Sequence, residues 1–552
     1  MGAIRYLGVI AICLMATSVG AVTFDYPINA GAGVNSSSND RGPAESSDEL
    51  TLYFVSERPG GQGPSSLWQS TRATTNDPFS SPTNIAPTNS VFADFSPAIS
   101  ADGLELFFVS YRPNGNTGDI WRSTRASTND PFAAPSILAN VNSANASDDD
   151  GPRSLSPDGL TLYMYSNRGG GVGSYDLYQA TRPTVNDDFG APVSLGGAVN
   201  SASEDIGPSV TADGLTMYFM SNRPGGLGSN SIWQSTRASV NDPFGPATLV
   251  PNVNSTAIDA APAVSTDGKR LYFQSERSGG FGGRDIWVAN AVDTPSNASF
   301  STAADLNVLD LDFGAVTLGS SVPSLTFDVA NYVATGDVAS MELVSAIGSG
   351  DTSKLTTNFG LSDRLQAGEF ESFLSSLDTS SLGSFSASYN FSFTDVLGSN
   401  QTITLNLTGE VVLTDDPNIP DLIYNAATGE VILDPDDSSI IGYTLQNNTD
   451  SFLPGNYTSI LGGVSTALTS ELSEAALSPG SGSIGNVFPT GLTLIELYDL
   501  LSVNTVSRSL GAPLVPFDLI VLGPVVPEPS TYVLGALGLV GLIACGRRRC
   551  LR

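Results

Sequence analysis

The chain has 552 residues and no histidine, with 23 Lys or Arg against 55 Asp or Glu, so its formal net charge is −32. The missing imidazole excludes Ser-His-Asp and Cys-His nucleophiles and the usual histidine-containing zinc and iron sites, and the acidic surface would repel the phosphate backbone of nucleic acid. The three cysteines, Cys13, Cys545 and Cys550, lie in terminal segments, so the large central part has no disulfide. This composition suits an exported protein made of strands and turns.

Residues 1–21 have the organisation of a secretory signal peptide. Arg5 precedes an apolar stretch at residues 7–15, and small residues such as Ser18 and Ala21 stand at the expected cleavage positions. The apolar stretch is too short to span a bilayer. We therefore expect Sec-type export, with a mature chain that begins near Val22.

Residues 22–295 contain five copies of one sequence unit. A Ser-x-Arg triplet recurs at intervals of about 55 residues and ends at Arg58, Arg112, Arg168, Arg223 and Arg277. Each triplet lies between a Ser-x-Asp-Gly-type turn and a short strand with an aromatic residue: Trp68, Trp121, Tyr178, Trp233 or Trp287. Short strands joined by Asp-Gly turns in a unit of this length fit one four-stranded propeller blade.

The motifs Ser-Pro-Asp-Gly-Leu-Thr-Leu-Tyr at 156–163 and Ser-Asn-Arg at 221–223 resemble the TolB-type, WD-like propeller repeat. The resemblance implies an all-β fold with a five-bladed β-propeller over residues 22–295. Six blades, as in TolB itself, would require a blade without the repeated motifs. Blades of this kind serve as binding platforms, scaffolds and occasionally enzymes, so the resemblance indicates fold rather than function.

A second periodic element predicts how the ring of blades closes. Asn-Ser occurs at Asn35, Asn89, Asn142, Asn200 and Asn254, and each copy is followed by an Asp-x-x-Pro that begins at Asp40, Asp94, Asp149, Asp205 or Asp259. The first copy precedes the first complete blade. We infer that residues 22–35 supply the outer strand of the last blade, which removes open sheet edges.

The Asp-x-x-Pro aspartates and the Ser-x-Arg arginines should share one rim of the propeller, and they are our candidate ligand-binding residues. The first interpretation is one Asp–Arg ion pair per blade, because elements common to all repeats usually serve the folding of each repeat. The alternative is a carboxylate ring that binds a hard cation such as calcium. The candidate metal ligands are Asp148, Asp149, Asp150 and Asp205.

Two further features bear on the propeller. Loops of the type Thr-Arg-x-x-x-Asn-Asp-Pro-Phe, at residues 72–79, 125–132 and 237–244, should lie on the opposite face, with a turn at Asn-Asp-Pro and the Phe inserted between blades. The version at residues 182–189 has Asp188 in place of the proline. Tyr111, Tyr165 and Tyr175 lie near loop ends. They are candidates for stacking on sugar rings, with blade core as the alternative.

The segment after the propeller predicts two more β modules. Residues 311–320, Leu-Asp-Phe-Gly-Ala-Val-Thr-Leu-Gly-Ser, resemble the opening strand of ASH-like, immunoglobulin-type sandwich domains, and alternating apolar residues support an Ig-like β-sandwich over 305–415. Residues 415–420 read as a linker, and residues 421–522 predict a second small β module. The natural role of both modules is that of spacers.

The C-terminus has three parts in a fixed order: Pro527-Glu528-Pro529, an apolar segment at 532–545, and Arg547-Arg548-Arg549. The order resembles the PEP-CTERM sorting signal of exported bacterial proteins. The resemblance implies that an exosortase recognises Pro-Glu-Pro while the apolar helix, within 526–552, holds the chain in the membrane and the arginines stay in the cytoplasm. We expect a transient or lasting membrane anchor, then location at the cell surface or in the extracellular matrix.

These features predict an exported bacterial surface protein whose propeller is a non-catalytic binding module for an extracellular polysaccharide or protein. The alternative is a carboxylate-based carbohydrate-active enzyme of the glycoside hydrolase type, since two acids suffice for that chemistry. No sequence feature selects such a pair among the 55 acids. Apart from the calcium considered above, no cofactor is expected.

Overall fold

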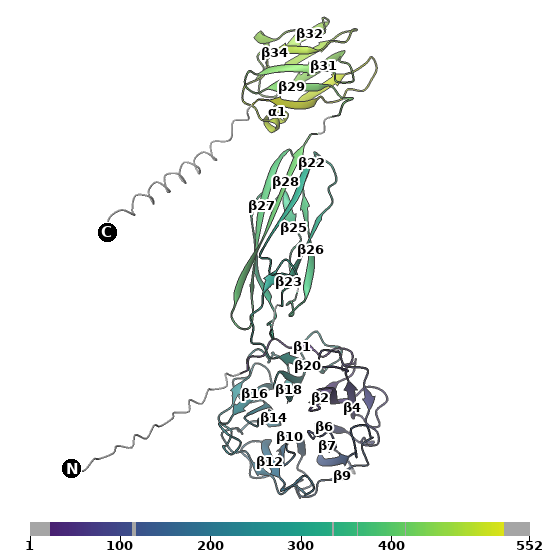
Figure 1. Ribbon diagram of the computed structural model, residues 1–552, viewed down its shortest axis with the longest axis vertical. Coiled ribbons are helices and arrows are strands. Elements are labelled where there is room, and N and C mark those ends of the chain that lie inside the picture. Colours follow the sequence, from purple (N-terminus) through teal and green to yellow (C-terminus); the bar gives the residue numbers. More distant parts are fainter. Residues whose placement is uncertain (1–21, 113–116, 334–335, 362, 414–415, 524–552) are drawn as a thin grey trace, which may run out of the picture.

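The computed structural model describes residues 22–112, 117–333, 336–361, 363–413 and 416–523. These residues form nine four-stranded sheets, one short α-helix, α1 (Leu494–Leu500), and one 3-10 turn, η1 (Pro454–Asn456). The sheets group into three bodies that follow one another along the chain (Figure 1). The expected all-β class is confirmed.

Five sheets are antiparallel blades around a common axis (Figure 1). Blade 1 comprises β2 (Asp40–Glu45), β3 (Thr51–Ser56), β4 (Ser66–Thr71) and β5 (Thr83–Asn84); blade 2 comprises β6 (Asp94–Ile99), β7 (Glu105–Ser110), β8 (Asp119–Thr124) and β9 (Ser136–Ile137). Blade 3 comprises β10 (Asp150–Leu155), β11 (Thr161–Ser166), β12 (Asp176–Thr181) and β13 (Val193–Ser194); blade 4 comprises β14 (Asp205–Val210), β15 (Thr216–Ser221), β16 (Ser231–Thr236) and β17 (Thr248–Leu249).

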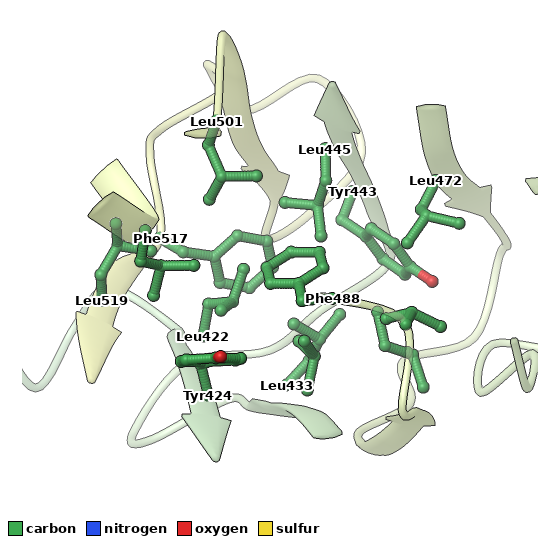
Figure 2. Packing of buried hydrophobic residues seen from close by; sticks show 14 of the residues in the cluster. Leu422, Tyr424, Leu433, Tyr443, Leu445, Leu472, Phe488, Leu501, Phe517 and Leu519 are labelled. Atoms are coloured by element: carbon green, nitrogen blue, oxygen red, sulfur yellow. The ribbon is translucent and has the colours of Figure 1, made fainter. Parts of the chain in front are cut away.

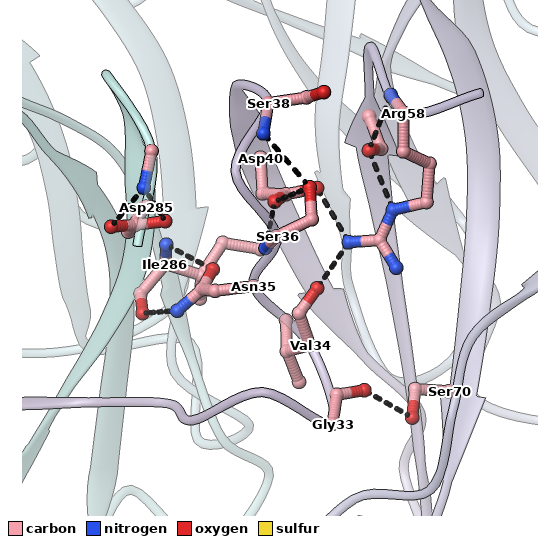
Figure 3. A network of polar contacts seen from close by, with 12 residues as sticks. Gly33, Val34, Asn35, Ser36, Ser38, Asp40, Arg58, Ser70, Asp285 and Ile286 are labelled. Atoms are coloured by element: carbon pink, nitrogen blue, oxygen red, sulfur yellow. Dashed lines mark hydrogen bonds and ion pairs between the residues drawn. The ribbon is translucent and has the colours of Figure 1, made fainter. Parts of the chain in front are cut away.

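Blade 5 closes the ring with a strand from the start of the described chain. Its strands are β18 (Asp259–Val264), β19 (Arg270–Ser275), β20 (Asp285–Asn290) and β1 (Ile28–Asn29). β1 pairs antiparallel with β20, and the Asn35 side chain exchanges two hydrogen bonds of 2.8 Å with the backbone of Ile286 (Figure 3). The predicted closure is confirmed, and the described residues form five blades.

The first turn of blade 1 shows how this closure is reinforced. In the other blades the turn contains a glycine with φ between 69° and 75°: Gly103, Gly159, Gly214 and Gly268. In blade 1 this position is Glu49, with φ of 61°, a conformation that costs a residue with a side chain about 1 kcal/mol or more. The Glu49 carboxylate accepts hydrogen bonds from Arg270 and from the Asp267 backbone, both in blade 5. The strained residue thus ties the first blade to the last.

The Arg-to-Phe loops pack between blades, as predicted. Phe79, Phe132, Phe189 and Phe244 are buried, each in a cluster that contains side chains of its own blade and of the preceding one. The arginine that begins each loop lies over the phenylalanine ring at 4.3–4.5 Å. Between blades 4 and 5 the corresponding ring is Phe24, which packs edge-on against Tyr218 with centroids 5.9 Å apart.

The second body is a sandwich of two sheets. One sheet has the order β21 (Ala298–Ser299), β23 (Leu325–Asn331), β26 (Phe370–Leu377), β25 (Leu355–Thr357), and the other β22 (Val308–Thr317), β28 (Asn400–Val412), β27 (Gly383–Thr394), β24 (Glu342–Gly350). Phenylalanines such as Phe327, Phe373 and Phe391 form the core between them. The first strand of this body, β21, lies before residue 305, where the sequence placed the start. The sequence did not reveal β21 because this strand is only two residues long.

The third body is also built from two sheets. Their orders are β34 (Gly482–Gly485), β30 (Glu430–Asp434), β29 (Asp421–Asn425), β36 (Asp518–Leu522), and β32 (Val464–Ala467), β33 (Glu471–Ala475), β31 (Gly442–Gln446), β35 (Val503–Ser507). Figure 2 shows Leu422, Tyr424, Phe488 and Phe517 packed in the shared core. The helix α1, which the sequence reading did not expect, begins with a capping box between Thr493 and Glu496.

Polar contacts join the sandwich to blade 5 and to the segment that precedes β1. The buried carboxylate of Asp25 accepts hydrogen bonds from the backbone and hydroxyl of Ser340, at 2.8 and 2.9 Å. Lys269, in the turn after β18, pairs with Asp337 at 2.6 Å. The innermost strand β18 begins on one face of the propeller and reaches this turn on the other. The sandwich therefore contacts the face opposite the loops that enter the innermost strands.

No helix among the described residues is long and apolar enough to cross a bilayer. The predicted signal peptide at residues 1–21 and the predicted membrane segment within 526–552 lie outside the described residues.

Candidate functional site

The predicted rim residues form one repeated unit inside each blade. One oxygen of each aspartate accepts a hydrogen bond from the arginine of the same blade, and the other accepts the backbone N–H of the serine in the Asn-Ser motif at 2.5–2.6 Å. Figure 3 shows this unit in blade 1, with Asp40 between Arg58 and Ser36. The aspartate side chains of all five units have no exposed surface.

Each arginine of these units is engaged on several sides. Its Nε donates to the serine of the Ser-x-Arg triplet, and its guanidinium lies 5.1–5.4 Å from the ring centre of the predicted strand aromatic. The unit thus joins two loops and the blade core. Its geometry matches the ion-pair interpretation of the motifs, in which Asp40, Asp94, Asp205 and Asp259 pair with Arg58, Arg112, Arg223 and Arg277.

Blade 3 departs from the predicted pairing. Arg168 pairs with Asp150, at 2.6 Å, instead of Asp149. Asp150 lies opposite Ser166 in the β10–β11 ladder, as Asp40 lies opposite Ser56 in blade 1. The Asp-x-x-Pro pattern misaligned this blade by one residue, because Pro152 follows the pairing aspartate by two positions where the other blades have three.

The candidate calcium ligands do not converge. The described residues contain no group of three or more acidic or cysteine side chains placed to hold a metal ion. Asp150 and Asp205 are paired with arginines, and Asp148 accepts hydrogen bonds from Ser143 and Asn145. Asp149 accepts hydrogen bonds from Gly118 and Tyr175. The acidity that the sequence concentrates here is therefore distributed over separate local contacts.

A cavity of about 350 Å³ lies on the propeller axis, at the end where the innermost strands begin; we call it the channel-mouth cavity. Every blade contributes to its lining: Arg41, Phe95, Tyr165, Ile206 and Gln274 come from blades 1 to 5 in turn. A smaller cavity of about 110 Å³ lies at the other end of these strands. The channel-mouth cavity faces away from the sandwich and is our candidate site, because all five blades line it.

The three tyrosines selected from the sequence meet at this cavity. Tyr111, Tyr165 and Tyr175 all line it, and the rings of Tyr165 and Tyr175 have centroids 6.2 Å apart. Gly151 makes room for Tyr165, since a Cβ at this position would lie 2.2 Å from the ring. Burial raises the pKa of Tyr165 to about 12, so its hydroxyl stays protonated at neutral pH.

Asp149 provides a carboxylate at the same cavity. It accepts a hydrogen bond of 2.6 Å from the backbone of Gly118 and one of 2.9 Å from the hydroxyl of Tyr175. Burial and the neighbouring Asp149 carboxylate raise the pKa of Tyr175 well above its usual range. The other lining carboxylate, Asp150, is committed to Arg168.

Arg153 is the residue of this site that sequence reasoning missed. It lines both axial cavities, is 4% exposed, and donates from Nε and Nη2 to the carbonyls of Pro262 and Ala261, at 3.1 and 2.5 Å. Alignment on Asp150 would have revealed it, because Arg153 then occupies the position of the proline in the other four blades: Pro43, Pro97, Pro208 and Pro262.

The PEP-CTERM protein-sorting motif matches residues 525–549. The match contains Pro527, Glu528 and Pro529 and the arginines Arg547, Arg548 and Arg549, so the resemblance seen in the sequence is confirmed. The motif marks the chain for export and sorting to the cell surface. No curated protein matches the chain.

Several solved structures are similar to parts of this chain. This chain is 12% identical to an α-L-arabinofuranosidase from Lactobacillus brevis, with a TM-score of 0.34 over 47% of this chain and 91% of that one. It is 12% identical to an α-L-arabinanase of Penicillium chrysogenum complexed with arabinobiose (TM-score 0.30, 49% and 97%). It is 10% identical to the β-propeller domain of the Trilobed protease from Pyrococcus furiosus (TM-score 0.25, 46% and 71%). The activities named here belong to those proteins.

Proposed function

We propose that the propeller of this exported, surface-sorted protein binds a saccharide unit of an extracellular polysaccharide at the channel-mouth cavity and does not cleave it. The observation that carries this proposal is the meeting of Tyr111, Tyr165 and Tyr175 at one axial cavity. Aromatic rings offer apolar faces to sugar rings, and their hydroxyls and the Asp149 carboxylate offer hydrogen bonds to sugar hydroxyls. A protein ligand, the other class expected from the sequence, would need a broader surface than this cavity provides.

The size of the cavity favours a short ligand segment. Small-molecule sites commonly have volumes of about 300 to 1,000 Å³, and the channel-mouth cavity, at about 350 Å³, lies at the lower end. A chain end or a single branch sugar suits it better than the middle of a polymer. The groups that the lining offers to a sugar include the three tyrosines and one carboxylate, Asp149, that is not paired with an arginine.

The carboxylates argue for binding without hydrolysis. Retaining and inverting glycosidases place two carboxyl groups about 5 to 9.5 Å apart on either side of the bond that breaks. The described lining of the cavity has Asp149 and its sequence neighbour Asp150, and Asp150 is held by Arg168. This arrangement supplies one acid where that chemistry needs two.

The position of the cavity suits display at the surface. The sandwich contacts the opposite face of the propeller, at the turn that contains Lys269, so the channel mouth is turned away from the sandwich. In this proposal an exosortase-type enzyme processes the Pro527-Glu528-Pro529 motif, and the propeller is the recognition head.

Calorimetric titration of the purified chain with a panel of bacterial and algal oligosaccharides tests the proposal. We expect binding that weakens about tenfold or more in Tyr111→Ala and Tyr175→Ala, in keeping with the loss of a stacking face. Tyr498→Ala is the matched control, because this side chain is 47% exposed on α1. Release of reducing ends from any panel member, or absence of binding across the panel, would contradict the proposal.

A further inference from the structure

Arg153 differs from the other deeply buried arginines of the propeller. Arg182 and Arg72, whose side chains are 1% and 6% exposed, pair with Glu105 and Glu45. Arg153 is as deeply buried, yet it donates hydrogen bonds to two backbone carbonyls, and its Nη1 has no hydrogen-bond partner among the described residues. Desolvation lowers the pKa of Arg153 to about 10, so the group remains charged at neutral pH.

A buried cation without an anion is costly, and proteins normally pair such groups. Tyr165 raises the pKa of Arg153 against this desolvation, but its hydroxyl is neutral at physiological pH. The two carbonyl contacts orient the guanidinium without neutralising it. The charge on the channel axis is therefore open to compensation by a ligand.

The location of Arg153 indicates where such a ligand would come from. Its side chain lines the floor of the channel-mouth cavity and the smaller cavity beyond it, so an anion that enters at the mouth meets the guanidinium at the bottom. Arg153 directly follows Gly151 and Pro152, where the sequence of blade 3 departs from the repeat. Proline cannot adopt the positive φ that Gly42, Ser96, Gly207 and Ala261 have at the corresponding position. All five innermost strands have a bulge at this point, and in blade 3 the register shift begins one residue later, at Pro152.

We propose that the channel-mouth cavity selects a saccharide with a carboxylate group, such as a hexuronate residue of an acidic polysaccharide, and that Arg153 binds this carboxylate. The inference rests on the proposed saccharide-binding function and names its ligand class. Guanidinium and carboxylate are geometrically matched for charge-assisted hydrogen bonds. Asp149, nearer the mouth, accepts hydrogen bonds from hydroxyls of the same ligand. The carboxylate of the ligand therefore lies deepest in the cavity, and its hydroxyls lie nearer the mouth.

The polarity of the cavity explains why the ligand enters in one orientation. A carboxylate beside Asp149 would be repelled, while a carboxylate beside Arg153 gains a partner in a site with little water. The remaining ring hydroxyls then lie among the tyrosines. A neutral sugar has the same stacking and hydroxyl contacts but leaves Arg153 uncompensated.

Pairs of ligands that differ only in charge provide the test. The purified chain is titrated with oligogalacturonate and with its methyl ester, and with oligomannuronate and its ester, which keep the ring and hydroxyls and remove the negative charge. We expect the acid form of at least one pair to bind about tenfold more tightly or better. In Arg153→Met this preference is lost, while the affinity for the ester stays within about twofold.

A structural role of Arg153, as a bridge between blades 3 and 5, makes a different prediction. In that case Arg153→Met lowers the melting temperature and weakens acid and ester alike, which would overturn the inference. Our proposal expects an unchanged or higher melting temperature, because an uncompensated buried charge has been removed. Arg153→Lys should retain part of the acid preference.

The two proposals can fail separately. Equal affinity of the wild-type chain for acid and ester would refute the role of Arg153 and leave saccharide binding intact. Binding of neutral oligosaccharides alone would have the same consequence. No binding of any saccharide would refute both.

Discussion

The hydroxyl of Tyr175 donates a hydrogen bond of 2.9 Å to the carboxylate of Asp149, at the mouth of the propeller channel. The corresponding position in blade 4 is Glu204, whose backbone N–H donates to Asn222 as that of Asp149 donates to Asn167. Asp149 lines the cavity, and it also accepts a bond from Gly118 in blade 2. The contact between Tyr175 and Asp149 is therefore a place where the five-fold repeat is broken in favour of a single site.

Adjacent aspartates of blade 3 should differ sharply in their effect on stability. Asp150→Asn removes the buried negative charge that pairs with Arg168. It should lower the free energy of unfolding by about 3 kcal/mol, as for other broken buried pairs. Asp149→Asn should cost less than about 1 kcal/mol, because its side chain is only partly buried and is not paired with an arginine. All four Trp residues of the chain lie in propeller strands, so thermal unfolding followed by Trp fluorescence reports on this body. Equal effects of the two variants would refute the assignment of Asp150 to the ion pair.

The same two acidic positions in blades 3 and 4 should differ in their effect on binding. Asp149→Asn should weaken the binding of neutral oligosaccharides about tenfold, since a carboxylate is a stronger acceptor of hydroxyl donors than an amide. Glu204→Gln is the matched control and should leave the affinity unchanged. Calorimetry with a ligand identified in the panel measures both. If the control variant is affected as strongly, the ligand lies elsewhere on the rim.

Phe24 should be essential for closing the ring. Its ring is 2% exposed and packs between blades 4 and 5, so Phe24→Ala should destabilise the propeller by about 3 to 5 kcal/mol. Phe281→Ala, at a position that is 53% exposed, is the control and should have little effect. The change is measured as a shift of the Trp-detected melting transition. A shift no larger than that of the control would show that β1 closes the ring without this anchor.

The stability of the propeller should depend on the ionisation of Glu45. Burial raises the pKa of this carboxyl group from its ordinary 4.5 to about 7, although Arg270 and Arg72 lie beside it. Because the folded state favours the protonated form, the contribution of Glu45 is fully present below about pH 4.5 and is lost as the pH rises through 7. A shift of this size corresponds to at most about 3 kcal/mol.

Glu45→Gln removes this pH dependence. We expect the melting temperatures of wild type and variant to converge at pH 5 and the variant to be the more stable at pH 8. Glu57→Gln, which removes a half-exposed acid paired with Arg41, controls for the general effect of net charge. A wild-type advantage that grows with pH would mean that the arginines keep Glu45 ionised.

Contacts within a blade were predictable from the sequence because they join residues close together in the chain. Arg58 and Asp40 are 18 residues apart, and the same spacing recurs in each blade, so one motif implies one contact five times. The repeat also predicted the closing strand, since its first copy stands before the first complete blade. The insertion of phenylalanines between blades was also predictable, because the loop motif that contains them repeats along the chain.

The channel-mouth cavity could not be read in this way. Equivalent positions of the five blades line it, such as Val55, Val109, Tyr165, Met220 and Gln274, but their side chains differ from blade to blade. Arg153 reaches the carbonyl of Ala261, 108 residues away, and the shift of one residue at Pro152 hid both Arg153 and the pairing role of Asp150. The sequence by itself determined the sorting motif, the five repeats and the ion pair in four of the five blades, since these depend on local spacing. Only the tertiary structure decided which side chains meet on the axis, because that depends on the closed ring bringing distant blades together.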